Sequence, residues 1–228
     1  MKEPVSLYKR SVCEALGTGL LVAAVVGSGI MGESLAAGNT AMALLANTIA
    51  TGAALAALIL TFRPLSGAHL NPAVSLALAV RGLMPWREAA FYVGAQFGGA
   101  LLGTILAHLM FRHPWYSVSI HRRSGPPQLL SEFVATFGLL CVIWGCTKIS
   151  SALAIPVAVA GYIVAAYWFT ASTSFANPAV SVARSITDTF SGIRPADVPG
   201  FIFAQITGAL VATLLFEWLD KEPDLARE

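Results

Sequence analysis

The chain has 228 residues, of which 56% are hydrophobic and only 11% are charged, with a net charge of +2 and a mean hydropathy of +0.71. Soluble domains average about 25% charged residues, so this composition excludes an ordinary soluble domain and indicates a polytopic membrane protein surrounded by lipid. The small net charge also argues against nucleic acid as a partner.

Six apolar stretches, taken in chain order, are each long enough to cross a hydrocarbon core of about 30 Å as a helix that rises about 1.5 Å per residue. They cover approximately residues 12–31, 40–62, 89–111, 129–148, 152–171 and 198–219. A polar connection at 112–128 separates the first three from the last three and is the one linker of the chain. The pattern predicts an all-α membrane protein with six transmembrane helices in a single domain over residues 1–228.

Two shorter apolar stretches, at 71–80 and 177–186, reach only about halfway across the membrane. Each opens on the pentapeptide Asn-Pro-Ala-Val-Ser. Asn is a preferred N-cap and Pro is favoured in the first turn, so the pentapeptide predicts a helix start within the membrane. Either stretch alone is equally compatible with an amphipathic surface helix, but the shared pentapeptide favours paired re-entrant half-helices. The two starts are formed by Asn71, Pro72, Ala73, Asn177, Pro178 and Ala179.

The duplication extends beyond the pentapeptide. Glu14 opens the first span and Glu132 the fourth, each in a Glu-x-x-x-Thr motif, while Gln96 lies in the third span and Gln205 in the sixth. Three spans per copy is an odd number, so the two halves (about 1–115 and 124–228) insert with opposite orientation as an inverted repeat. The half-helices then meet near the midplane, where their N-termini place partial positive charge.

A carboxyl group in a spanning helix is costly and therefore needs a role. Glu14 and Glu132 could carry protons or ions, or they could accept hydrogen bonds from backbone N–H groups of the re-entrant segments. Their symmetric positions favour the acceptor role. Gln96 and Gln205 are interpreted as hydrogen-bonding partners between helices. The positions interpreted as close helix contacts are Gly94, Gly98, Gly99, Gly103, Gly161 and Gly208.

The basic residues predict the orientation of the chain. With both termini inside, nine of the 14 Lys and Arg residues, including Lys2 and Arg227, fall on the inner side. We therefore expect a multi-pass protein of the inner (plasma) membrane with both termini in the cytoplasm.

No set of residues predicts an enzyme. The chain has no nucleophile–base pair and no nucleotide motif, and its histidines lack the spacing of metal ligands. Three cysteines, Cys13, Cys141 and Cys146, fall in or beside predicted spans and are interpreted as small buried apolar side chains. We expect no catalytic residue, no metal and no cofactor.

Together these pieces resemble the aquaporin, or major intrinsic protein, family. The resemblance is carried by EALGT, SGAHLNPAVS, the second Glu-x-x-x-Thr, SFANPAVS and the two glutamines, in the family's order along nearly the whole chain. It implies a homotetramer in which six helices and two half-helices surround one narrow pore per subunit. Asn71 and Asn177 then offer N–H groups to a permeating oxygen, and the carbonyls of the segment around His69 line the inner entrance. Passive transport of small uncharged solutes is implied, by the mechanism already described for aquaporin-type pores.

One departure concerns the outer constriction. Most members of the family carry Arg directly after the second Asn-Pro-Ala, whereas this chain carries Val180. Arg184, one helical turn further on, is not assigned the missing role. Spacing from the motifs gives a constriction made of Thr51, Ala165 (or Ala166 after a one-residue slip), Ser174 and Val180.

That set has no cation and no aromatic ring, so it predicts a wide opening. The alternative is that an aromatic ring of the run 167–169 fills the gap. In this combination the chain resembles the bacterial aquaporin branch associated with arsenic resistance, which implies passage of arsenite, As(OH)₃, and methylated arsenicals besides glycerol-like solutes and water. Exclusion of protons and cations is expected to rest mainly on the half-helix dipoles.

Two other classes of function remain open from the residues. One is an inverted-repeat secondary transporter of a small solute, coupled at Glu14 or Glu132. The other is a member without a working pore, retained for adhesion or membrane organisation. The ionisable groups sit near helix starts and not beside the broken helices, which disfavours the transporter, and the small constriction residues disfavour a blocked pore.

Overall fold

The computed structural model describes residues 5–221 of the chain. Lys2 and Arg227, which contribute to the orientation argument, lie outside the described residues. Every regular element within this range is helical. The elements are α1 (Leu7–Leu35), α2 (Thr40–Ser66), α3 (Pro72–Val80), α4 (Trp86–Met110), α5 (Pro126–Cys146), α6 (Ala154–Phe169), α7 (Pro178–Ala183), the 3₁₀ helices η1 (Arg184–Ile186) and η2 (Pro195–Asp197), and α8 (Val198–Leu219).

The described helices match the predicted spans in number and order, although α1 and α2, with 29 and 27 residues, are longer than predicted. Five of them, α1, α2, α4, α5 and α8, are long and apolar enough to cross a membrane. The sixth, α6, has 16 residues and is shorter than the predicted 152–171. It ends at Phe169 because Thr170 adopts extended backbone (φ −109°, ψ 138°), with which the second re-entrant segment begins.

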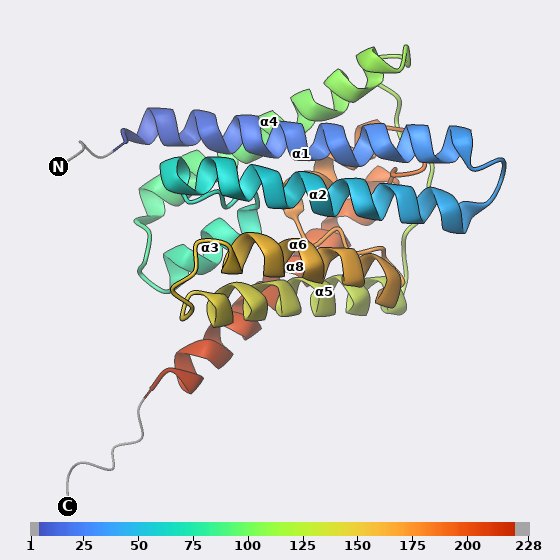
Figure 1. Ribbon diagram of the computed structural model, residues 1–228. Helices are drawn as coiled ribbons and strands as arrows, with labels where there is room; N and C mark the ends of the chain where they lie inside the picture. Colours follow the sequence, from blue (N-terminus) through green and yellow to red (C-terminus); the bar gives the residue numbers. More distant parts are fainter. Residues whose placement is uncertain (1–4, 222–228) are drawn as a thin grey trace, which may run out of the picture.

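The helices form a bundle around the two half-helices. Figure 1 shows α1 and α2 side by side along one edge, with α5 and α6 side by side on the opposite edge, and the start of α1 and the end of α8 on the left. We call the left end the termini end, and the opposite end, which holds the connection 111–125, the connection end. Large apolar side chains such as Leu102 and Phe203 are exposed on the outside of the bundle. This surface suits contact with lipid acyl chains.

Two helix pairs approach most closely, and they are equivalent in the two halves. A Cβ atom added at Gly99 of α4 would overlap the Ala15 carbonyl of α1, and one added at Gly208 of α8 would overlap the Phe133 carbonyl of α5. Gly103 makes the same kind of contact with α1. The close-contact interpretation is wrong for three other glycines, because a Cβ there would meet no atom within 4 Å: Gly94, Gly98 and Gly161.

Charges at the termini end are paired. Arg10 contacts Glu88 at 2.8 Å, and Asp220 accepts from Arg81 at 2.9 Å and from Lys148 at 2.5 Å. These hydrogen bonds from Lys148 and Arg81 lower the pKa of Asp220. The pairs tie the ends of α5 and α8 to the turn after α3.

The predicted linker is a bound segment of the structure. The backbone N–H groups of Ser117 and Ser119 donate to the carbonyls of Ile186 (3.1 Å) and Ser185 (3.0 Å) at the end of the second half-helix. The polar residues of 111–125 therefore reflect a segment held against η1 at the connection end, and α5 begins already at Pro126.

Candidate functional site

Each half-helix begins at the asparagine of its Asn-Pro-Ala motif. The Asn71 side-chain oxygen accepts from the Ala73 backbone N–H at 2.9 Å, and the Asn177 oxygen accepts from Ala179 at 3.0 Å. The proline that follows occupies the first helical position, where no donor is needed. Because the amide oxygens are used as caps, only the amide N–H groups remain to face the centre of the bundle.

The same two amides tie the motifs to each other. Asn71 Nδ2 donates to the Ala176 carbonyl at 2.7 Å, and Asn177 Nδ2 donates to the Leu70 carbonyl at 2.8 Å. An amide nitrogen carries two hydrogens. Each asparagine therefore keeps one N–H that is not used by the described residues, and both side chains line the central cavity.

Glu14 supports the first re-entrant segment from behind. One carboxyl oxygen accepts from Ser66 Oγ (2.7 Å) and the His69 N–H (3.0 Å), and the other accepts from the Leu70 N–H (2.7 Å) and Gln96 Nε2 (2.8 Å). This is the acceptor role expected from the sequence. Backbone donors without helical partners are thus satisfied inside the membrane.

Glu132 repeats the arrangement in the second half. Its oxygens accept from the N–H groups of Phe175 and Ala176, both at 2.9 Å, and from Gln205 Nε2 at 2.6 Å. Gln205 also contacts Ser181 Oγ at 2.9 Å. The expectation that the ionisable groups lie away from the broken helices is wrong, because both glutamates contact the re-entrant segments, but neither lines the central cavity.

Both re-entrant segments contain residues in the left-handed region of backbone space. The φ angles are 50° at Ala68, 51° at Leu70, and 47° at both Ser174 and Ala176. Each such residue costs on the order of 1–2 kcal/mol without a glycine. The glutamate hydrogen bonds stabilise this conformation in both halves.

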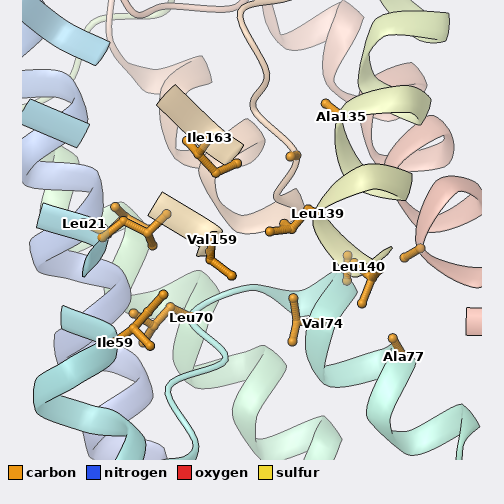
Figure 2. Close-up of a cluster of buried hydrophobic side chains, with 14 of the residues drawn as sticks. Leu21, Ile59, Leu70, Val74, Ala77, Ala135, Leu139, Leu140, Val159 and Ile163 are labelled. Atoms are coloured by element: carbon orange, nitrogen blue, oxygen red, sulfur yellow. The ribbon is translucent and has the colours of Figure 1, made fainter. Parts of the chain in front are cut away.

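The central cavity has a volume of about 360 Å³ and runs from the termini end past both asparagines. Most of its wall is apolar. Figure 2 shows Leu21, Ile59, Val74 and Leu139 projecting from surrounding helices toward a common central space. These side chains are buried, yet they line a cavity rather than fill a solid core.

His69 lies in the first re-entrant segment and lines the termini end of the cavity. Its Nδ1 is 3.0 Å from Ser75 Oγ, and its ring lies 5.2 Å from the Tyr92 ring. The ring is therefore fixed by a hydroxyl on one side and an aromatic side chain on the other.

Three of the four predicted constriction residues, Thr51, Ser174 and Val180, line the cavity. Ala165 does not: it lies on the exposed face of α6, and Ala166 is buried without lining the cavity. Residues four apart share a helix face, so α6 turns Ile163 and Tyr167 inward and Ala165 outward.

Tyr167 therefore occupies the place predicted for Ala165, which is the alternative in which an aromatic ring fills the gap. Its hydroxyl donates to Thr51 Oγ1 at 3.3 Å. Ser174 Oγ is buried and has no hydrogen-bond partner within the described residues. An aromatic ring therefore lines the cavity at this level, and the Ser174 hydroxyl remains available to a solute.

A cation is also present, which contradicts the prediction of a constriction without one. Arg184 is 2% exposed and lines the cavity beside Val180. Its Nε donates to the Ser191 carbonyl, and its guanidinium carbon lies 3.4 Å from the centre of the Phe175 ring. Its Nη1 is buried without a hydrogen-bond partner among residues 5–221.

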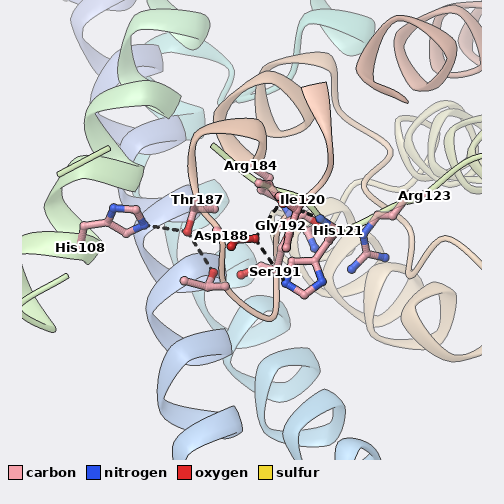
Figure 3. Close-up of polar contacts among 11 residues, drawn as sticks. His108, Ile120, His121, Arg123, Arg184, Thr187, Asp188, Ser191 and Gly192 are labelled. Carbon is pink, nitrogen blue, oxygen red and sulfur yellow. Dashed lines mark hydrogen bonds and ion pairs between the residues drawn. The ribbon is translucent and has the colours of Figure 1, made fainter. Parts of the chain in front are cut away.

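A second arginine comes from the connection between the halves. Arg123 donates from Nε to the Gly192 carbonyl (2.8 Å) and from Nη1 to the Ser172 carbonyl (3.2 Å), and its guanidinium carbon lies 5.1 Å from the same Phe175 ring. Both arginines line a second cavity of about 430 Å³ at the connection end. Figure 3 shows them beside the loop that carries Ser191 and Gly192.

Sequence reasoning missed Arg184 and Arg123 as cavity residues, and it gave Tyr167 only as an alternative. For Arg184 a signal was present, because a residue four positions after Val180 lies on the same helix face. The direction of Tyr167 depends on the rotation of α6, and that of Arg123 on the fold of an irregular segment, so no local pattern predicts either.

The cysteines form no site. Cys13, Cys141 and Cys146 are free and half-buried, so the prediction of full burial was wrong in degree. Within residues 5–221 no group of His, Cys, Asp or Glu is arranged to hold a metal ion.

The fold and site together define a membrane channel built from an inverted repeat with two re-entrant half-helices. The family described as Major intrinsic protein matches residues 1–151, which is more than half of the chain. The chain belongs to the major intrinsic protein family, whose members are transport channels and not enzymes. The predicted family and fold class are thereby confirmed.

Similar proteins cover nearly the whole chain. Aquaglyceroporin AqpS of Rhizobium meliloti (strain 1021) is 58% identical over 93% of this chain and 91% of its own length. Probable aquaporin AqpM of Archaeoglobus fulgidus is 30% identical over 96% and 99%. The structure of the aquaglyceroporin from Plasmodium falciparum superposes with a TM-score of 0.73 at 21% identity, covering 93% of this chain and 96% of that chain, and supports the fold.

Proposed function

We propose that this chain is a passive channel for water and small uncharged hydroxylated solutes such as glycerol. The observation that carries the proposal is the cavity that passes both Asn-Pro-Ala motifs, with an apolar wall and a few polar groups facing inward. The similarity to proteins named as aquaglyceroporins supports the same class of solute.

The polar groups are spaced along the cavity, and each can form a hydrogen bond with a hydroxylated solute as it passes. Asn71 and Asn177 each offer an N–H at the centre, and Ser174 offers a hydroxyl at the constriction. A neutral solute replaces hydrogen bonds to water with hydrogen bonds to these groups, while its carbon atoms contact the apolar wall. A hydrated ion loses more solvation than these groups return.

We extend the proposal to arsenite. As(OH)₃ is uncharged and, like glycerol, carries three hydroxyl groups, so it suits the same pattern of hydrogen-bonding groups. The resemblance to the arsenic-associated branch supports this extension, as do the Val at position 180 and the hydroxyls of Thr51 and Ser174 at the constriction. Methylated arsenicals, with fewer hydroxyls, depend more on the apolar wall.

A coupled transporter is the alternative function, and the glutamates argue against it. The oxygens of Glu14 and Glu132 accept hydrogen bonds from re-entrant backbone and glutamine donors. No carboxyl group is among the described residues that line the central cavity. A coupling carboxyl group would have to leave its structural contacts in each cycle.

We also propose that the channel is a homotetramer in the plasma membrane, with the termini end in the cytoplasm. The connection end, with Arg123 and Arg184, then faces outward. Native mass spectrometry of the detergent-solubilised protein tests the tetramer, and protease access to a tag at either terminus in sealed vesicles tests the orientation.

A stopped-flow solute panel in proteoliposomes tests the channel function. Water, glycerol, urea, arsenite and methylarsenicals are compared with protein-free vesicles and with Thr51→Trp, in which a large ring enters the constriction. We expect glycerol and arsenite flux that rises linearly with concentration and ignores proton and sodium gradients. Saturating, gradient-dependent flux would identify a transporter, and flux equal to that of empty vesicles would exclude a pore.

A further inference from the structure

The connection end of the pore contains a buried cation, Arg184, and a half-buried one, Arg123, that the channel proposal does not yet use. Arg184 lines both the central cavity and the second cavity, and Arg123 lines the second. Arg184 follows Val180 by four residues and therefore lies on the same face of the second half-helix.

The reach of Arg184 follows from helix geometry. Side chains on a helix lean toward its N-terminus, so a long side chain at one position covers the level of the residue one turn earlier. The Arg184 guanidinium accordingly lies over the Phe175 ring, which precedes Asn177, and not outside the bundle. It therefore stands at the level of Val180, in the path of a solute.

The position of this guanidinium is fixed. Phe175 is held by its backbone N–H to Glu132, and its ring packs edge-on against Phe201 with centres 5.2 Å apart. Arg184 stacks on that ring and also donates from Nε to the Ser191 carbonyl. The arrangement leaves Nη1 without a partner.

Neither arginine of the pair forms a salt bridge within the described residues. Among residues 5–221 the ion pairs involve other basic residues, and neither guanidinium contacts a carboxyl group. Asp197 accepts from the backbone N–H of Arg123 and pairs with Arg194 instead. Two positive charges within 5.1 Å of one ring therefore add their repulsion at the mouth of the pore.

We propose that Arg184, together with Arg123, is the cation barrier of this pore. The barrier comes from the far end of the second half-helix and from the connection between the halves, instead of from position 180. It replaces the expectation that the half-helix dipoles carry most of the exclusion, since α7 is only six residues long. The inference rests on the proposed channel function.

Urea and guanidinium provide the test, because they are nearly the same planar shape and differ by one charge. Urea entry is measured by stopped-flow swelling, and guanidinium entry by uptake of the labelled cation at non-denaturing concentration into vesicles that contain K⁺ and valinomycin, so that K⁺ efflux balances the charge. The wild type is expected to pass urea and exclude guanidinium. Arg184→Gln is expected to raise the guanidinium rate relative to the urea rate about ten-fold, and the double variant with Arg123→Gln further, as removal of a unit charge a few ångströms from the path requires.

Matched variants separate charge from structure. Arg184→Lys keeps the charge and is expected to keep guanidinium excluded, whereas a purely structural role would be lost in Lys and Gln alike. Arg122→Gln removes the exposed neighbour of Arg123 and is expected to leave the ratio unchanged. If Arg184→Gln fails to assemble, Arg123→Gln alone carries the test, with a smaller rise.

The outcomes also separate this inference from the channel proposal. Wild-type vesicles that pass neither glycerol nor urea would refute the channel. Wild-type vesicles that pass a neutral solute and also pass guanidinium at the urea rate would refute the barrier alone. The barrier is likewise refuted if every arginine variant leaves guanidinium at the rate of empty vesicles while neutral flux persists.

Discussion

The first re-entrant segment (67–80) and the second (171–186) are held in place by equivalent hydrogen bonds, but they present different side chains to the cavity. In each, a glutamate accepts the backbone donors, a glutamine bridges that glutamate to a serine of the half-helix, and an asparagine caps the helix. Aligning Asn71 with Asn177, however, aligns His69 with Phe175 and Leu78 with Arg184.

The difference shows which requirements are shared by both ends of the pore. Unpaired backbone donors in a membrane impose the same demand on both segments, so the same residues meet it twice. The residues that face the cavity differ between the two segments: Leu78 of the first half-helix takes the place that Arg184 has in the second, while Arg63 and His69 line the cavity at the termini end. The supporting hydrogen bonds are therefore symmetric, and the side chains that face the cavity are not.

The symmetric support is tested by removing it from each half in turn. Glu14→Ala and Glu132→Ala each leave at least two backbone N–H groups without acceptors, at a cost of about 1–3 kcal/mol for each unmade bond. We expect a loss of roughly 3–5 kcal/mol or failure to assemble, equal in both halves, measured by thermal unfolding and size-exclusion chromatography. Glu14→Gln and Glu132→Gln, which keep one acceptor oxygen, should lose less. If either alanine variant unfolded at the wild-type temperature, the two glutamates would not play equivalent roles in the two halves.

Close packing of the equivalent helix pairs gives the next largest effect. Gly99→Ala pushes α4 away from α1, and Gly208→Ala pushes α8 away from α5. In both variants the new methyl group overlaps a backbone carbonyl of the neighbouring helix. We expect each to cost about 1–3 kcal/mol of stability, as overpacking does. Gly94→Ala is the matched control on α4, with open space at its Cβ, and should unfold at the wild-type temperature.

Adding a second arginine at the connection end tests whether Val180 lies at the constriction. Val180→Arg places a long side chain beside Arg184 on one helix face, so the opening narrows. We expect glycerol and arsenite rates to fall about ten-fold or more and water to fall less. Stopped-flow rates for the three solutes decide this, and an equal loss for all of them would show that Val180 is not at the constriction.

A smaller effect is expected on α6. Tyr167→Ala should widen the constriction and raise the rate of larger polyols relative to water, because the ring that faces Thr51 is removed. Ala165→Leu changes the exposed face of the same helix and should leave the ratio unchanged. The opposite pattern would restore Ala165 to the constriction.

The smallest effect concerns the paired charges of the termini end. Asp220→Asn removes the negative charge that pairs with Arg81 and Lys148, and we expect a slight fall in melting temperature at neutral pH. Because hydrogen bonding lowers the folded-state pKa of Asp220, its contribution is present above the unfolded value near 4 and disappears as pH falls through the lower folded value. The wild type and the variant should therefore converge in acid, and a gap that persists there would contradict the pairing.

Much of this fold could be predicted from the sequence because the features that determine it lie in neighbouring residues or occur twice in the chain. The two helix starts follow from Asn-Pro, the inverted repeat follows from three spans per copy, and the acceptor role of Glu14 and Glu132 follows from the cost of unpaired groups in a membrane. The glycine contacts were predictable only in part, since Gly99 meets a neighbouring helix and Gly94 does not.

The sequence by itself determined the membrane class, the order of spans and half-helices, and the paired asparagines at the centre, because apolar length and capping chemistry are read from neighbouring residues. Only the tertiary structure decided what faces the solute at the connection end. The rotation of α6 points Tyr167 into the cavity in place of Ala165. The Arg184 side chain leans toward the start of its helix and so lies at the level of Val180. Arg123 lines the second cavity because the connection between the halves is bound against the bundle. Those three outcomes depend on contacts between segments far apart in the chain, which no local pattern encodes.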